Sequence, residues 1–152
     1  MTMTDVNALV NALFVDTNIL IYASIYESPF HQAAQRALKS AYQNKRTLWI
    51  SRQVLREYLV VVTRPDNFKN PLSKDKIVNR IHFFQQKFKV ADDLPEVTRH
   101  LMELIENYKV GGKQIHDANI VATMKAYNIT NLLTYNVSDF KRFKDIIQIE
   151  SL

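Results

Sequence analysis

The 152-residue chain contains no cysteine, only two glycines and four prolines, and no apolar run long enough to cross a membrane. Without cysteine it has no disulfide, no thiolate nucleophile and no cysteine-ligated zinc site, which suits a reducing cytoplasm. The most apolar stretch, residues 12–25, is shorter than the roughly 20 residues of a membrane-spanning helix and includes Asp16. The residues before it carry Asp5 but no lysine or arginine, so we expect no secretory signal.

The composition is that of an ordinary globular domain. Hydrophobic residues make up 47% of the sequence and charged residues 23%, which excludes a disordered or collagen-like chain. Because no repeat or low-complexity stretch interrupts the sequence, we expect one domain over residues 1–152. The formal net charge of +5 is compatible with a polyanionic partner but does not identify one by itself.

Short apolar segments alternate with helical segments along the chain. The expected strands are short, apolar and bounded by polar residues: 12–16, 47–50, 89–91, 131–135 and 146–149. A short helix is expected from Asn18, and longer helices have start signals at Ser28-Pro29, Ser73 and Leu94-Pro95 or an apolar face at helical spacing: 28–42, 52–63, 73–88, 94–108 and 115–127. This alternation predicts an α/β sandwich with a central parallel sheet.

Two carboxylates follow expected strands. Asp16 ends the first strand, and Asp139 lies in the turn after the strand at 131–135. In an open parallel sheet, ligands bind beyond the carboxyl ends of the strands where the strand order reverses. Each residue also has a simpler explanation, because Asp16 suits the N-cap of the next helix and Asp139 suits a turn.

Two further carboxylates lie on expected helices. Glu57 is at the edge of the apolar face of the helix at 52–63, where a carboxylate is unfavourable without a cation or a hydrogen-bond donor. Its neighbour Arg56 points to the solvent side. Asp117 is in the first turn of the helix at 115–127, where the helix dipole stabilises an acidic residue. The simpler alternatives are an ion pair between Glu57 and a nearby arginine and a purely structural role for Asp117.

As a set, the four acids favour a divalent metal ion. Carboxylates that converge on one cleft repel one another by several kcal/mol in a low-dielectric site, and a hard cation relieves this repulsion. Oxygen ligands favour Mg²⁺ or Mn²⁺ over zinc. An ion of this kind in basic surroundings suits the hydrolysis of a phosphodiester bond.

Several motifs, in this order, resemble the PIN-domain ribonucleases, most closely the VapC-type toxins of toxin–antitoxin pairs: FVDTNILIYA, REY, TRPDNFKNPLS and GKQIHDANIVATMKAYNITNLLTYNVSDF. The resemblance extends from Leu13 to Ile149. It implies a Rossmann-like PIN fold, a three-layer sandwich with a central parallel sheet. The implied activity is that of an endoribonuclease dependent on Mg²⁺ or Mn²⁺, the toxin of a type II toxin–antitoxin system.

The resemblance also assigns roles to residues. It implies that Asp16, Glu57 and Asp117 are catalytic metal ligands. We assign the fourth place to Asp139, because Asn136 stands where many relatives have an acid and would at most hold water or another ligand. Three polar residues match family positions that orient ligands or substrate: Thr17, Asn18 and Thr134.

The implied partners are an RNA substrate, a small antitoxin that inserts a segment into the cleft, and a second copy of the chain in a homodimer. Candidate contacts to the RNA backbone are basic side chains: Arg52, Arg56, Arg64, Lys69 and Lys113. Tyr22, Trp49 or Phe68 would stack on an unpaired base. His116, beside Asp117, is a further candidate contact to the substrate, with polarity at the helix N-terminus as the simpler alternative. Arg56 and Arg64 suit a solvated surface equally well, and Trp49 suits the core.

Other enzyme classes do not fit the sequence. A haloacid-dehalogenase-like phosphatase needs a second aspartate two residues after the first, where this chain has Asn18. The sequence has neither GxGxxG for dinucleotides nor GxxxxGK[ST] for a P-loop. The alternative that remains is a catalytically inactive PIN-like module that binds RNA or protein and keeps the acids as caps and ion pairs.

Overall fold

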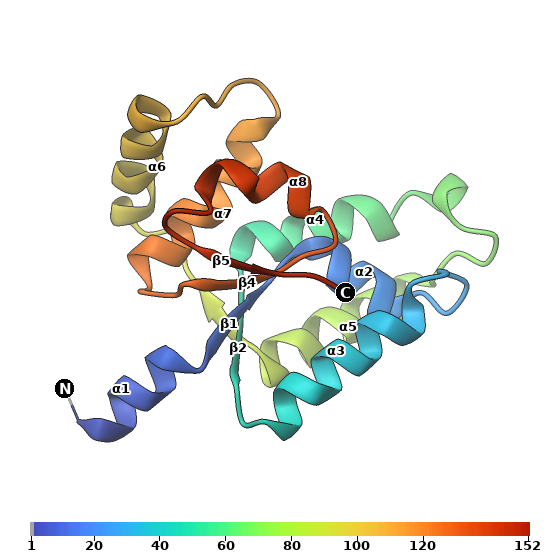
Figure 1. Cartoon of the computed structure of the whole chain (residues 1–152). Helices are drawn as coiled ribbons and strands as arrows, with labels where there is room; N and C mark the ends of the chain where they lie inside the picture. The colour runs from blue at the N-terminus through green and yellow to red at the C-terminus, as the bar shows by residue number, and fades with distance from the viewer. Residues whose placement is uncertain (1) are drawn as a thin grey trace.

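The computed structural model describes residues 2–152, apart from the side chains of residues 8–10, and contains a five-stranded parallel sheet with helices on both sides (Figure 1). The strands are β1 (Ala12–Val15), β2 (Thr47–Ser51), β3 (Lys89–Ala91), β4 (Asn131–Leu133) and β5 (Gln148–Glu150). Their order across the sheet is β3-β2-β1-β4-β5, and all four neighbouring pairs are parallel. The predicted α/β sandwich is confirmed, although β4 ends two residues earlier and β5 begins two residues later than expected.

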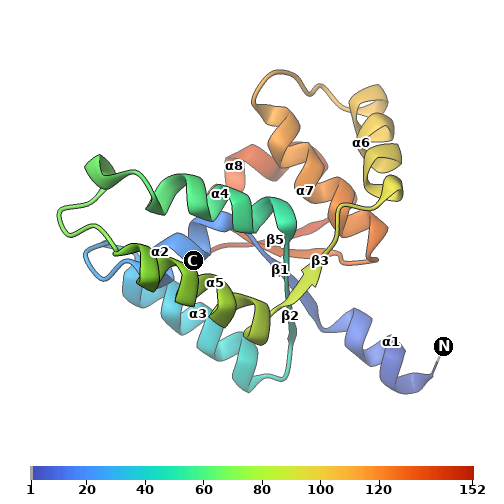
Figure 2. The same ribbon diagram turned by 180° about the vertical axis from the view of Figure 1, so that it is seen from behind.

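The helices connect the strands: α1 (Met3–Val10), α2 (Thr17–Ser24), α3 (His31–Gln43), α4 (Arg52–Val62), α5 (Lys74–Lys87), α6 (Pro95–Asn107), α7 (Gln114–Ala126) and α8 (Val137–Phe140), with the 3₁₀ turns η1 (Pro65–Asn67) and η2 (Lys141–Phe143). Helices α2, α3 and α5 lie on one side of the sheet, and α6 and α7 lie on the other (Figures 1 and 2). Helix α1, which the sequence analysis did not predict, extends away from the sheet (Figure 1). Among the described residues, none of the helices has both the length and the apolar character needed to cross a membrane.

Two of the three predicted start signals coincide with a helix start. The Ser73 hydroxyl caps α5 by accepting a hydrogen bond from the backbone N–H of Lys76, and Pro95 is the first residue of α6. The signal at Ser28-Pro29 is wrong by two to three residues. There the Ser28 hydroxyl accepts from the N–H of Phe30 and its carbonyl accepts from that of His31, so these residues form a turn and α3 begins at His31.

Burial of the strands explains why their sequences are short apolar runs. All four residues of β1 are buried, because helices cover both faces of the sheet. The largest fully buried side chains include Phe14 of β1, Ile50 of β2, Leu132 of β4 and Ile120 of α7. This packing fixes the carboxyl ends of the central strands, where the candidate site lies.

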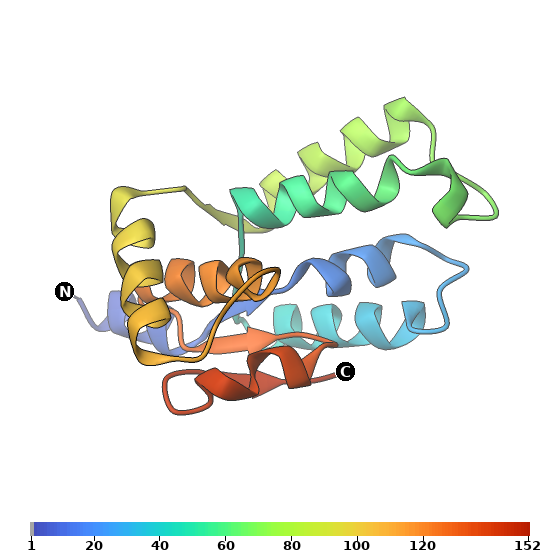
Figure 3. The same ribbon diagram turned by 90° about the horizontal axis from the view of Figure 1, so that it is seen from above.

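The strand order reverses between β1 and β4. From β1 the chain adds β2 and β3 on one side of the sheet and then returns to add β4 and β5 on the other (Figure 3). The carboxyl ends of β1 and β4 are therefore neighbours, and the N–H of Asp16 donates to the carbonyl of Leu133 at 3.0 Å. This is the position at which open parallel sheets bind their ligands.

Candidate active site

Asp16 directly follows β1 and is 6% exposed. Its Oδ1 accepts from the N–H of Thr17 at 2.8 Å, and its Oδ2 accepts from Thr134 Oγ1 at 2.8 Å and Asn18 Nδ2 at 3.1 Å. Burial raises the pKa of Asp16 to about 6, although these hydrogen bonds act in the opposite direction and the charge of Glu57 adds to the rise. Asp16 is therefore the N-cap of α2, and it is also a buried carboxylate held by three donors.

Glu57 lies on α4 and is partly buried, as its place on the helix predicts. Its Oε2 accepts from Thr17 Oγ1 at 2.7 Å, and its Oε1 accepts from Gln53 Nε2 at 2.7 Å. Among the described residues Glu57 forms no ion pair with an arginine, which was the simpler alternative, and Arg56 pairs instead with Asp93 at 3.1 Å. Two neutral donors hold Glu57, so they fix its orientation and leave its negative charge uncompensated.

Gln53, which the sequence analysis missed, connects α4 to α7. Its side chain is buried, and its Nε2 also donates to the carbonyl of His116 at 2.9 Å. Asn119 Nδ2 in turn donates to Gln53 Oε1 at 2.7 Å. The sequence signal that could have identified Gln53 is its place about one helical turn before Glu57, on an otherwise apolar face. Gln53 therefore links the helix of Glu57 to the first turn of the helix that carries Asp117.

Asp117 is half-buried in the first turn of α7. Its pKa is raised to about 6, mainly by burial and also by the charges of Asp139, Asp16 and Glu57, while Arg142 opposes the rise. The four predicted acids thus come from four different segments and are close enough for the other three to act on Asp117. Asp139 itself is exposed on α8.

The side chains around these acids have defined roles. The N–H of Asn136 donates to Thr134 Oγ1 at 3.0 Å, so Asn136 supports the threonine that donates to Asp16. None of the ion pairs formed by the described residues includes any of the four acids. Among the described residues, no three acidic or histidine side chains lie close enough together to hold a metal ion in their present orientations.

Two of the predicted basic contacts are engaged in ion pairs away from the acids, and the others are exposed. Arg52 pairs with Asp92 at 3.1 Å, and Arg56 pairs with Asp93, at the end of β3 and two strands from β1. Arg64, Lys113 and His116 are exposed. Trp49 is partly buried in β2 against Tyr127, with ring centroids 5.2 Å apart.

A basic residue that the sequence analysis did not single out lies closer to the acids. Arg142 of η2 lowers the pKa of Asp117. Its Nη1 donates to the carbonyl of Lys109 at 2.6 Å and to Gln114 Oε1 at 2.9 Å. Arg142 therefore holds the loop before α7 and brings a positive charge to the carboxylate cluster.

Comparison with known proteins identifies the family. The family model of the PIN domain matches residues 13–146, so the chain belongs to the PIN domain family. Among curated relatives, ribonuclease VapC48 of Mycobacterium tuberculosis is 26% identical over 136 residues, which are 86% of this chain and 91% of the relative. The resemblance predicted from the motifs is confirmed at the level of the family.

Solved structures share the fold. VapBC2 from Rickettsia felis, solved bound to a DNA fragment from its promoter, is 24% identical with a TM-score of 0.65 and covers 93% of this chain and 98% of its own. VapC20 from Mycobacterium tuberculosis, described as a sarcin–ricin loop cleaving toxin, is 18% identical with a TM-score of 0.61 and covers 79% and 86%. At these identities the likeness establishes the PIN fold.

Proposed function

We propose that this chain is a metal-dependent endoribonuclease, the toxin of a type II toxin–antitoxin pair acting in the cytoplasm. The observation that carries the proposal is the cluster of Asp16, Glu57, Asp117 and Asp139 at the reversal of strand order, without an ion-pair partner in residues 2–152. The names of the relatives support RNA as the substrate class, since VapC48 is a ribonuclease and VapC20 cleaves the sarcin–ricin loop. The VapBC complexes support a small antitoxin as partner.

The donor set suits Mg²⁺ or Mn²⁺. All four side chains offer hard carboxylate oxygens, and two of them have a pKa raised to about 6, so a cation would relieve an existing electrostatic cost. The carboxylates that would hold the ion are Asp16, Glu57, Asp117 and Asp139, after rotation of the less constrained side chains. When bound, such an ion supplies positive charge to the scissile phosphate and makes water a better nucleophile.

The acids differ in how firmly hydrogen bonds hold their carboxylates. Asp16 and Glu57 are fixed by their donors, so they would hold their positions while substrate binds. No hydrogen bond among the described residues holds the carboxylate of Asp117, so this side chain can turn toward the ion. One of the four carboxylates would also act as the base that takes a proton from the attacking water.

The test is cleavage of a structured RNA by the purified protein with Mg²⁺, with Mn²⁺ and with EDTA. We expect cleavage only with metal, and a loss of about 100-fold or more in Asp16→Asn and Asp117→Asn. Asp75→Asn, an exposed acid in the first turn of α5, is the matched control and should cleave normally. Salt-sensitive RNA binding without cleavage, unchanged by these substitutions, would identify the inactive module instead.

The fourth ligand and the assembly need separate measurements. If Asp139→Asn leaves both cleavage and metal affinity intact, Asp139 is not a ligand, and Asn136→Ala then tests the alternative position.

We also propose that the chain forms a homodimer, which light scattering on the purified protein would test by its mass in solution.

A further inference from the structure

Three aromatic side chains, Tyr22, Phe30 and Tyr135, form a continuous strip next to the acid cluster. The ring centroids of Phe30 and Tyr135 are 4.5 Å apart, those of Tyr22 and Phe30 are 5.0 Å apart, and those of Tyr22 and Tyr135 are 5.4 Å apart. Tyr135 is nevertheless 40% exposed. A tyrosine that rests on two other rings is held in place and still offers part of its ring to a ligand.

The strip is attached directly to the acid site. Tyr135 follows Thr134, which donates to Asp16, and the N–H of Tyr135 donates to Asn18 Oδ1 at 3.1 Å. Asn18 Nδ2 in turn donates to Asp16 Oδ2. Tyr22 lies one helical turn after Asn18 on α2, on the same helix face and about 6 Å further along the axis. The strip therefore begins beside the carboxylate of Asp16 and leads away from it.

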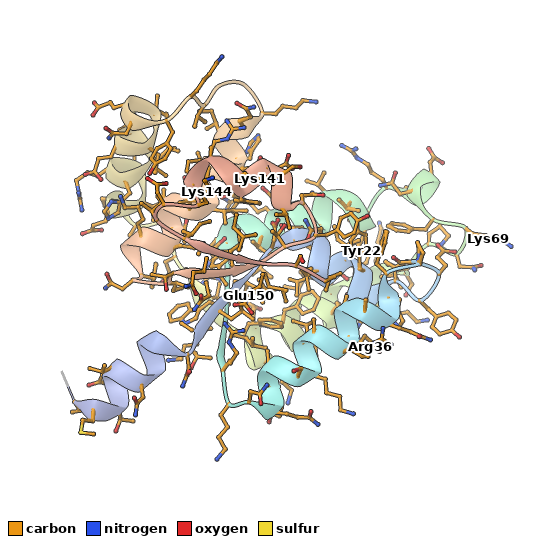
Figure 4. The ribbon with its side chains drawn as sticks, in the orientation of Figure 1. Tyr22, Arg36, Lys69, Lys141, Lys144 and Glu150 are labelled. Carbon is orange, nitrogen blue, oxygen red and sulfur yellow. The ribbon has the colours of Figure 1, made fainter. Side chains whose placement is uncertain are left out.

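At Tyr22 the strip reaches an open hollow of about 400 Å³. Ile21 and Ile25 contribute apolar surface to it, and Phe68 and Lys69 line it from the loop after η1. Glu27 also lines it, and its Oε1 accepts from the N–H of Lys69 at 3.1 Å. Tyr22 and Lys69 lie on the same side of the molecule (Figure 4). The hollow thus combines aromatic rings, an ammonium group and a carboxylate acceptor.

These groups suit an unpaired nucleobase. Bases stack on aromatic side chains because every base has a π-face, and a lysine beside the stack attracts the phosphate backbone. The hydrogen bonds from Tyr135 to Asn18 and from Asn18 to Asp16 hold the start of the strip next to the acids. The formal net charge of +5 also favours binding of a polyanion such as RNA, although the cleft itself is acidic.

We propose that Tyr135, Tyr22 and the adjoining hollow bind an unpaired base that flanks the scissile phosphate and so position the RNA strand at the acids. This inference rests on the proposed ribonuclease function and adds the residues that hold its substrate. Tyr135 is a specificity residue in this scheme, because it contacts the substrate but not the reacting atoms.

The experiment uses an RNA hairpin cleaved in its loop and a series of copies with one abasic site at each position around the cleavage point. In the wild-type protein, we expect an abasic site at one position to reduce kcat/KM roughly 5- to 100-fold, the effect of losing one stacked base. Tyr135→Ala should show a similar loss on intact RNA and should no longer distinguish intact from abasic RNA. Tyr135→Phe keeps the ring and should behave as wild type.

The matched control is Tyr42→Ala on α3, a tyrosine that is 70% exposed and outside the strip. A fluorescent base analogue, 2-aminopurine, at the sensitive position gives a second readout, since stacking should quench it with wild type and Tyr135→Phe but not with Tyr135→Ala. An unchanged melting temperature shows that each variant is folded. Tyr22→Leu provides a second substitution within the strip.

The outcomes separate this inference from the proposed function. If the wild-type protein cleaves no RNA with metal, the proposed function is wrong and this inference is overturned with it. If it cleaves RNA but Tyr135→Ala keeps the wild-type abasic penalty, only this inference is wrong. If Tyr135→Ala weakens binding of a peptide from a protein partner and leaves base discrimination intact, the strip is a protein-docking surface and the inference is overturned.

Discussion

We expect the substitution Asp16→Asn to stabilise the metal-free protein at neutral pH, although it removes a predicted catalytic group. Asp16 is 6% exposed and belongs to none of the ion pairs in residues 2–152. Burial raises its pKa from the ordinary 3.8 to about 6. A shift of this size means that the charged carboxylate lowers the free energy of unfolding by about 3 kcal/mol.

The sign of the pH dependence follows from the direction of the shift. Below pH 3.8 the carboxyl is protonated in both the folded and the unfolded state, so it costs nothing. As the pH rises from 3.8 to about 6, the unfolded state loses its proton first and the folded state becomes less stable. Above about pH 6 the cost is constant. Removing the charge of Asp16 also lowers the pKa of Asp117, which acts in the same direction.

The asparagine variant does not gain the whole of this stability of about 3 kcal/mol. It keeps an acceptor for the N–H of Thr17, but its amide NH₂ faces Thr134 Oγ1 and Asn18 Nδ2. The threonine hydroxyl can turn to accept, so about one hydrogen bond, that from Asn18, worth about 1 kcal/mol, is lost. The net gain above pH 6 is then about 2 kcal/mol, or roughly 4–8 °C in melting temperature for a domain of this size.

The assay is urea denaturation of both proteins in EDTA between pH 4 and pH 7.5. We expect the two free energies of unfolding to be similar near pH 4 and to diverge as the pH rises. Adding Mg²⁺ at ten times its Kd should stabilise the wild type by about 1.4 kcal/mol and the variant much less. The reasoning is refuted if Asp16→Asn is no more stable than wild type at pH 7.5 in EDTA, or if their difference does not change with pH.

Three further substitutions test the surroundings of the acids. Gln53→Met removes the donor to Glu57 and should lower kcat about tenfold with little change in KM, measured by steady-state cleavage. Thr134→Val removes a donor to Asp16, so the pKa of Asp16 should rise and the acid limb of the pH–rate profile should move to higher pH. Arg46→Gln removes a two-pronged ion pair with Glu150, 2.7 Å in both contacts, and should lower stability by about 1–2 kcal/mol in urea denaturation while cleavage is unchanged.

The sheet and Asp16 could be predicted because their signals are local. Each strand is a short apolar run between polar residues, and β3 was predicted to the residue since Lys89–Ala91 lies between a helix and a polar loop. Asp16 ends a fully buried strand, so a parallel sheet places it at the ligand-binding edge. The start of α3 was missed because Ser and Pro also suit the turn that residues 25–31 form.

The support around the acids could not be predicted, because it depends on how distant helices pack. Gln53 contacts His116 and Asn119, residues 63 and 66 positions away, and nothing near Gln53 in the sequence specifies those partners. The ion pairs of Arg52 and Arg56 could not be predicted for the same reason. Arg52 and Arg56 form ion pairs at the end of β3, because β3 pairs with the strand that precedes them.

The geometry of Asp16 and Glu57 supports the proposed enzyme over an inactive module. An N-cap needs only a side-chain acceptor, which asparagine supplies as well as aspartate, so capping does not explain a buried carboxylate whose charge costs about 3 kcal/mol. An ion pair would explain Glu57, but its two oxygens accept from neutral donors while Arg56 is engaged elsewhere. Proteins keep destabilising groups of this kind where activity requires them. Both carboxylates therefore support the proposal that the site binds a cation.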